Sequence, residues 1–241
     1  MTTTRFRKIA AIAIALTLVG GAALSLPANA ATTATRYVTV NSEGTIKVTP
    51  DAVRLNANVS VVAGSNKDAL AKTSTAAAAV RAALTKAGIL KGDIATQSIS
   101  VYPEYNYTQD KGSVLIGYRG SQGFVVTIKN AENAGAVVDA VVAAGGDALQ
   151  IQGVTPFVLD SSASTESARA NAVKNAKAKA TSYAKLLGAK LGRVNYLVEN
   201  SSPISYPPVM AMAKAAESDA TVVDLGQQDV TVSITIQWAL L

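Results

Sequence analysis

The stretch VRLNANVSV, residues 53–61, alternates apolar and polar side chains. Its apolar positions are Val53, Leu55, Ala57, Val59 and Val61. A period of two is typical of a β-strand with one face buried and the other in water. Because all-parallel strands usually read as continuous apolar runs, this pattern favours an antiparallel or mixed sheet.

The same alternation occurs near the end of the chain in DVTVSITIQW, residues 229–238. Between these two predicted strands, apolar residues recur with helical periodicity in three segments, residues 65–87, 131–144 and 164–187. Ser65 with Asp68 resembles a capping box, Asn130 is a candidate cap, and Gly88 is a stop signal. The side chains expected to face inward are Leu70, Thr73, Ala77, Val80, Leu84 and Ala87 in the first helix, Val137, Val138, Val141 and Val142 in the second, and Val173, Ala176, Ala180, Tyr183 and Leu187 in the third.

The order of elements predicts the fold class. Between residues 52 and 159 it is strand, helix, strand, strand, helix, strand, which is the split-βαβ order. One or two strands precede this unit, and one helix and two strands follow it. We therefore expect an α+β protein with a largely antiparallel sheet and about three helices packed on one face.

Residues 1–30 have the features of a signal peptide. Arg5, Arg7 and Lys8 precede an apolar run over residues 9–18, and Ala-Asn-Ala at 28–30 forms a small-x-small cleavage site. A membrane anchor is the rival interpretation, but the run is well short of the roughly 20 residues that span a bilayer as a helix. We expect an exported protein, in the periplasm, the cell envelope or outside the cell.

Composition excludes several kinds of chemistry. The chain has no Cys and no His, so it has no disulfide, no thiolate, no imidazole base and no usual zinc site. The carboxylates form no calcium-loop motif, and the glycines of GYRGSQG, residues 117–123, form no phosphate loop. We predict no catalytic residue, no metal and no cofactor. The formal charge of +6 includes three leader cations, and the remaining +3 is too small to indicate nucleic acid.

The stretch SISVYPEYNY, residues 98–107, gathers three tyrosines in a predicted hairpin strand. Period two places Tyr105 and Tyr107 on one face and Tyr102 on the other. A turn at residues 108–113 would bring Ile116 near Tyr105 and Tyr118 near Pro103. Tyr102 and Tyr118 are therefore candidate contacts for a ligand or partner.

Residues 201–228 form a long connection rich in Pro, Met, Ser and Ala. Connections of this length are usually functional or disordered. Tyr206, Met210 and Met212 supply adaptable apolar surface, which makes them further candidate contacts.

Four segments together resemble the SIMPL-domain family of bacterial exported proteins. They are VTVNSEGTIKVTPDAVRLNANVSV at 38–61, GILKGDIATQSISVYPEYNY at 88–107, AGGDALQIQGVTPFVLD at 144–160 and NAKAKATSYAKLLGAKLGRVNYLVE at 175–199. Gly44 and Pro50-Asp51 match the family's opening, while Ser42 replaces a glycine and Asp147 replaces the usual asparagine. The resemblance divides the chain into a signal peptide at 1–30 and a SIMPL-like domain at 31–241 with an insertion at 201–228.

The resemblance implies an extracytoplasmic α+β domain without an established enzymatic activity. Some members resemble ring-forming or channel-like homo-oligomers, and some protect against oxidative stress. We expect a non-enzymatic protein that acts at the cell envelope through homo-oligomerisation or contact with an envelope protein or membrane surface, with a role in stress defence. The alternative is a binding module for a small apolar or aromatic ligand, which native mass spectrometry would detect as a copurifying mass. A third hypothesis is an enzyme that uses Ser-Lys or carboxylates.

Overall fold

The computed structural model describes residues 36–200 and 220–241. The signal-peptide prediction lies outside this part of the chain, as does most of the predicted insertion. The strands are β1 Tyr37–Val48, β2 Ala52–Ala63, β3 Ile94–Thr108, β4 Gly112–Ile128, β5 Leu149–Phe157, β6 Leu191–Glu199 and β7 Gln228–Leu240. The helices are α1 Asn66–Lys86, α2 Ala134–Gly145 and α3 Ser162–Leu186.

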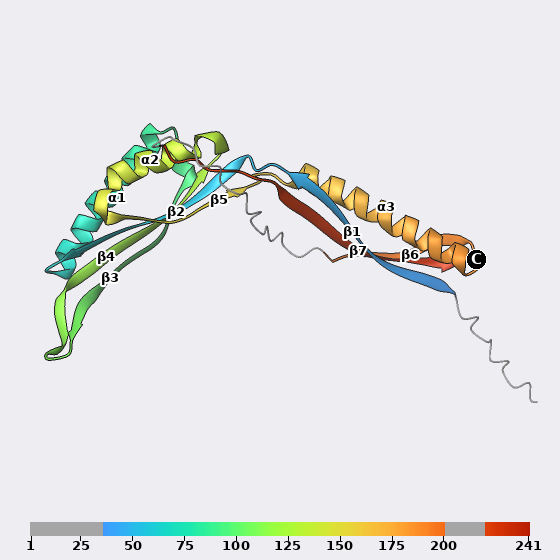
Figure 1. The fold of residues 1–241 in the computed structure, drawn as a ribbon, viewed down its shortest axis with the longest axis horizontal. Coiled ribbons are helices and arrows are strands. Elements are labelled where there is room, and N and C mark those ends of the chain that lie inside the picture. The colour runs from blue at the N-terminus through green and yellow to red at the C-terminus, as the bar shows by residue number, and fades with distance from the viewer. Residues whose placement is uncertain (1–35, 201–219) are drawn as a thin grey trace, which may run out of the picture. The chain divides into compact units, whose positions relative to one another are not determined.

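The strands form two antiparallel sheets, so the α+β class is confirmed but the single sheet is not. One sheet has the order β3-β4-β2-β5 and the other β1-β7-β6. The four-stranded sheet carries the predicted split-βαβ unit, with α1 packed on β2 and β4 (Figure 1). The first strand pairs with the last, since β1 runs antiparallel to β7 from Tyr37 opposite Ala239 to Val48 opposite Gln228.

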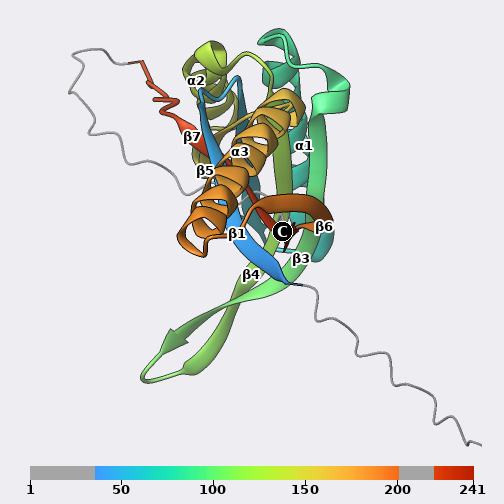
Figure 2. The same cartoon turned by 90° about the vertical axis from the view of Figure 1, so that its right-hand side faces the viewer.

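Each sheet has its own hydrophobic core. The four-stranded sheet and helices α1 and α2 enclose Leu55, Val59, Phe124 and their neighbours. The three-stranded sheet and α3 enclose the predicted apolar face of β7, from Val230 to Trp238. The three helices therefore do not cover one sheet, and α3 forms a separate layer on β1 and β7 (Figure 2).

The buried stripe of α3 differs from the prediction. It consists only of alanines, and the larger predicted residues Val173, Tyr183 and Leu187 are exposed; Tyr183 is 46% exposed and Leu187 68%. The buried residues are Ala168, Ala172, Ala176, Ala180 and Ala184. The reason is the close approach of the helix to Gly44 of β1, whose missing side chain leaves room for the backbone of Ala168 and Ala172.

Three further inward predictions are wrong. Leu70 in α1, Ala87 at its C-terminal end and Val142 in α2 are exposed, while Ala69 and Thr73 face the sheet. A side chain on Gly120 of β4 would meet Ala69 and Thr73, so α1 also lies close to a glycine. Helix-to-sheet distance, rather than hydrophobicity, selects the buried positions here.

The predicted helix ends are largely confirmed. The Ser65 hydroxyl accepts a hydrogen bond from the Asp68 backbone N–H at 3.1 Å, and Gly88 follows α1 with a φ of 87°. The second helix begins later than predicted, because residues 131–133 form a 3-10 turn capped by Asn130. Within the described ranges, no helix combines the length and apolarity needed to cross a membrane.

Candidate functional site

The hairpin of β3 and β4 extends beyond the strand that supports it. Pairing between β2 and β4 ends at Ala63 opposite Tyr118, while β3 and β4 stay paired as far as Thr108 opposite Gly112. Residues 104–117, which we name the hairpin arm, are therefore a two-stranded ribbon that projects from the sheet (Figure 2).

The hairpin arm is unusually apolar for an exposed ribbon. Tyr107 is 78% exposed and Ile116 55%. The large exposed apolar side chains of the arm are Tyr105, Tyr107, Val114, Leu115 and Ile116. Tyr105 lies opposite Leu115 on one face, and Val114 lies opposite Asn106 on the other. Since an isolated two-stranded hairpin is marginally stable in water, apolar groups on both of its faces indicate a contact surface.

The predicted pairing of this hairpin is confirmed at its base and wrong by one residue further out. Tyr118 lies opposite Pro103, as expected. Tyr105 lies opposite Leu115 rather than Ile116, because an irregularity between Glu104 and Tyr105 shifts the register. A β-bulge of this kind inserts an unpaired residue and changes the side-chain alternation.

An ion pair holds the base of the arm to the sheet. The Arg119 guanidinium donates to both carboxylate oxygens of Glu104, at 2.6 and 2.7 Å, and to the Ser60 hydroxyl at 3.1 Å. Both charged side chains are partly buried. The hydrogen bond from Arg119 lowers the pKa of Glu104 below its usual value of 4.5. The bidentate geometry fixes the orientation of the arm at its first residue.

We predict that this ion pair makes stability depend on pH. Because the pKa of Glu104 is lowered in the folded state, the pair stabilises the fold above the unfolded pKa near 4.5 and is lost as pH falls through the folded pKa. Thermal melting should show Glu104→Gln below wild type at pH 7, with the gap closing at an acidic pH below the lowered pKa of Glu104. Glu132→Gln, at a carboxylate with no ion pair within 4 Å among the described residues, serves as the control. An unchanged gap at both pH values would contradict the assignment.

The structure does not bring the predicted site residues together. Tyr102 lies opposite Arg119 and Tyr118 opposite Pro103, so the two tyrosines point to opposite faces of the sheet. Tyr206, Met210 and Met212 lie outside the described residues. Val114, Leu115 and Ile116 were missed, because apolar residues in a strand normally predict burial. The signal that could have found them is length, since β3 and β4 have 15 and 17 residues and β2 only 12.

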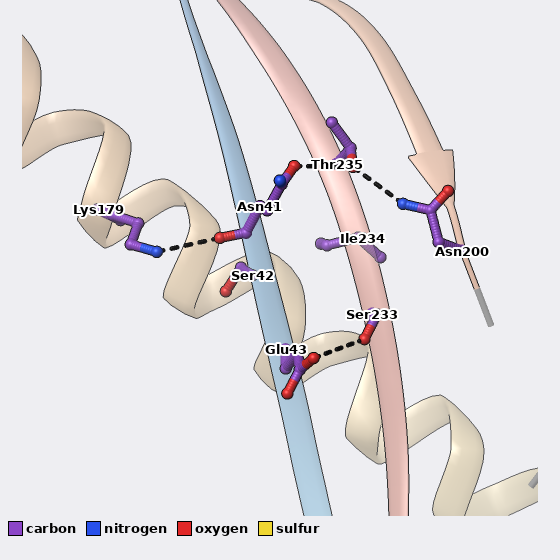
Figure 3. A pocket seen from close by; sticks show the side chains of 8 residues that line it. All are labelled: Asn41, Ser42, Glu43, Lys179, Asn200, Ser233, Ile234 and Thr235. Atoms are coloured by element: carbon purple, nitrogen blue, oxygen red, sulfur yellow. Dashed lines mark hydrogen bonds between the residues drawn. The ribbon is translucent and has the colours of Figure 1, made fainter. Parts of the chain in front are cut away.

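A polar depression lies on the three-stranded sheet. It has a volume of about 520 Å³ and is lined by Asn41, Ser42, Glu43, Lys179, Asn200, Ser233, Ile234 and Thr235. The Thr235 hydroxyl donates to Asn41 Oδ1 at 2.9 Å, and the Ser233 hydroxyl donates to Glu43 Oε1 at 3.0 Å (Figure 3). Lys179 of α3 reaches the strand edge, where its Nζ donates to the Asn41 carbonyl at 3.1 Å.

Neither the arm nor the depression has the groups of a metal centre. In the part of the chain that the structure describes, no three His, Cys, Asp or Glu side chains gather closely enough to hold an ion. An apolar depression lies between α1 and α2, has a volume of about 770 Å³ and is lined mainly by alanines, among them Ala83 and Ala140. The surfaces available for function are thus an apolar arm, an alanine-lined groove and a polar sheet face.

The model of the SIMPL family, described as a protein of unknown function (DUF541), matches residues 38–238. The chain belongs to the SIMPL family. This SIMPL protein is 31% identical over 230 residues to the 26 kDa periplasmic immunogenic protein of Brucella melitensis, covering 89% of this chain and 90% of that one. It is also 27% identical over 227 residues to the uncharacterized protein YggE of Edwardsiella ictaluri, covering 92% and 94%, and 28% identical over 182 residues to YggE of Escherichia coli K12, covering 74% and 72%.

The name of one relative supports the predicted location of the chain. The Brucella relative is named as a periplasmic protein and aligns with nearly the whole SIMPL protein. An exported, extracytoplasmic location, first predicted from the leader sequence, is therefore supported by the comparison as well.

Proposed function

We propose that this SIMPL protein is a non-enzymatic protein of the cell envelope that acts by self-association through the hairpin arm. The observation that carries the proposal is the exposure of Tyr105, Tyr107, Val114, Leu115 and Ile116 on a ribbon that projects from its sheet. Exposed apolar groups that gather on one element mark contact surfaces more often than scattered ones do.

An energy estimate favours a second copy over an unrelated surface. Full burial of a large apolar side chain contributes about 1.5–3 kcal/mol, so the five partly exposed ones of one arm would contribute roughly 5 kcal/mol. Association costs about 4 kcal/mol or more in lost translational and rotational freedom. One arm alone is therefore marginal. A symmetric contact buries the same patch on both subunits and doubles the gain.

The alternative partners for the arm are an envelope protein and a membrane surface. Tyrosines at the arm and Lys111 in its turn would suit the interface of a bilayer, where such residues are enriched. Their number is small, and the mature chain's charge of +3 adds little attraction to anionic lipid. Self-association through the arm requires no other molecule.

A contribution to stress defence is part of the same proposal. It would be indirect, because a chain without Cys has no thiol to oxidise and reduce in turn. Protection would then follow from an intact assembly in the envelope rather than from scavenging.

The proposal predicts that removing apolar groups from the arm dissociates the assembly. The double variant Tyr107→Ser with Leu115→Ser should weaken self-association by roughly 10,000-fold, since each subunit of a symmetric dimer loses two contacts of about 1.4 kcal/mol each. Size-exclusion chromatography with light scattering over a dilution series measures the effect.

The matched control is Leu186→Ser on α3, which removes a side chain that is 79% exposed but lies outside the arm. It should leave the assembly unchanged. A wild-type protein that is strictly monomeric at the highest concentration, or equal effects of the arm and control variants, would exclude the arm as a self-association surface.

A further inference from the structure

The face of the three-stranded sheet that is turned away from α3, which we name the open face, carries side chains outside the proposed function. Period two places the odd-numbered residues of β1 and β7 on it. Those of β1 are exposed, whereas Val40, Val232 and Ile236 are buried on the opposite face. The open face is therefore accessible along β1, from Tyr37 to Lys47, and half-buried over Ser233, Thr235 and Gln237 of β7.

Side-chain hydrogen bonds connect β1 and β7 at every open-face pair except Tyr37 with Ala239. From one end to the other, the pairs are Gln237 to Thr39 at 3.1 Å, Thr235 to Asn41 at 2.9 Å, Ser233 to Glu43 at 3.0 Å, Thr45 with Thr231 at 3.0 Å, and Lys47 to Asp229 at 3.2 Å. Asn195 and Asn200 extend this network from beyond β7, donating to Gln237 and Thr235. These bonds hold hydroxyl and amide groups in fixed positions before any ligand binds, which lowers the entropy cost of binding.

Two tyrosines lie at one end of the open face. Tyr37 of β1 is 58% exposed and lies opposite Ala239, and Tyr196 of β6 is 43% exposed and lies opposite Gln237. They flank β7 from its two neighbouring strands, so about two strand spacings of ~4.8 Å separate their backbones. From Tyr37 to Glu43 the face runs about 20 Å at ~3.3 Å per residue, and the depression of Figure 3 lies midway along β1, at residues 41–43.

The chemistry of this face suits few classes of ligand. Lys47 pairs with Asp229, and Glu43, which accepts from Ser233, stands beside Lys179 in the lining of the depression. The Glu43 carboxylate offsets the charge of Lys179, so a phosphate polymer meets no excess of positive charge there, and an apolar partner would leave Asn41 Nδ2 and Glu43 Oε2 unpaired. A sugar chain matches both the polar groups and the tyrosines of this face. Its hydroxyls donate and accept hydrogen bonds, and its C–H faces stack on aromatic rings.

We propose that the open face binds a linear, uncharged oligosaccharide, with Tyr37 and Tyr196 as stacking platforms and Asn41, Glu43 and Asn200 as hydrogen-bonding groups. Asn41 Nδ2 and Glu43 Oε2 have no partner among the described side chains and remain available to sugar hydroxyls. This function is separate from self-association through the arm, because the two surfaces lie on different sheets.

The test is calorimetric titration of the purified protein with three soluble probes, the tetrasaccharides of N-acetylglucosamine, β-linked glucose and α-linked glucose. Binding of at least one is expected in the micromolar to millimolar range. Tyr37→Ala and Tyr196→Ala should each weaken it about tenfold, and Asn41→Ala by a similar factor. Tyr183→Ala, on α3 and 46% exposed, is the matched control and should bind like wild type.

No binding of any probe up to about 10 mM, ten times a Kd of about 1 mM, would overturn the proposal. So would equal losses in Tyr183→Ala and Tyr196→Ala, or open-face variants that change the molecular mass in solution and leave sugar binding intact. Cosedimentation with purified insoluble cell-wall glycan distinguishes the sources: sedimentation that Tyr196→Ala abolishes assigns the site to wall glycan, and soluble binding alone assigns it to free oligosaccharide.

Discussion

Replacing Gly44 with alanine is expected to lower the free energy of unfolding by about 3 kcal/mol. A Cβ at this position would collide with the Ala168 carbonyl oxygen and the Ala172 amide nitrogen. Both are backbone atoms of α3, so no rotamer change relieves the clash. The helix must move away from β1, and the alanine stripe then loses its contact with the sheet.

Urea unfolding measures this effect, with Gly64→Ala as the control. Gly64 lies just after β2, and a Cβ there would meet no atom within 4 Å. The control should therefore unfold within about 0.5 kcal/mol of wild type. A Gly44→Ala variant as stable as Gly64→Ala would show that α3 does not approach the sheet as closely as described.

Phe124→Ala is expected to cost about 3–5 kcal/mol in the free energy of unfolding. Phe124 is fully buried between the four-stranded sheet and its helices, and Arg81 of α1 lies over its ring at 5.5 Å. The substitution removes the ring from the core and leaves a cavity whose walls are held by two strands, since Phe124 lies opposite both Ala57 and Thr96.

Phe157→Ala is the matched control, because this ring also lies under an arginine, Arg54 at 4.7 Å, but is only partly buried at the end of β5. Its cost should be about 1 kcal/mol, close to the average substitution. Equal costs for the two phenylalanines in urea unfolding would mean that Phe124 does not lie at the centre of the core.

Local patterns predicted most of the elements of this fold. The alternation over residues 53–61 and 229–238 marked β2 and β7, and Ser65 and Gly88 marked the ends of α1. These features depend on side-chain period and on caps, which involve residues close together in the chain. Gly44 was noticed as a family marker, but its reason lies in α3, more than a hundred residues further along.

The contact surfaces were harder to predict. Tyr102 and Tyr118 stood out as aromatic residues, yet they face opposite ways. In the sequence, Leu115 and Ile116 have the pattern of ordinary strand residues. They are exposed because the pairing of β2 with β4 ends at Ala63 opposite Tyr118. Whether an apolar strand residue is core or surface depends on what lies beside it, and that neighbour comes from another part of the chain.

The sequence by itself determined the α+β class, the split-βαβ order and the absence of thiol and imidazole chemistry, because composition and short-range period suffice for each, and the resemblance of four segments indicated the SIMPL family. Only the tertiary structure decided that the strands divide into two sheets, that alanines rather than larger residues face β1, and that the hairpin arm is exposed. Strand partners and helix-to-sheet distances are set by long-range packing, since many strands share the same period of two and only their mutual fit selects the pairs.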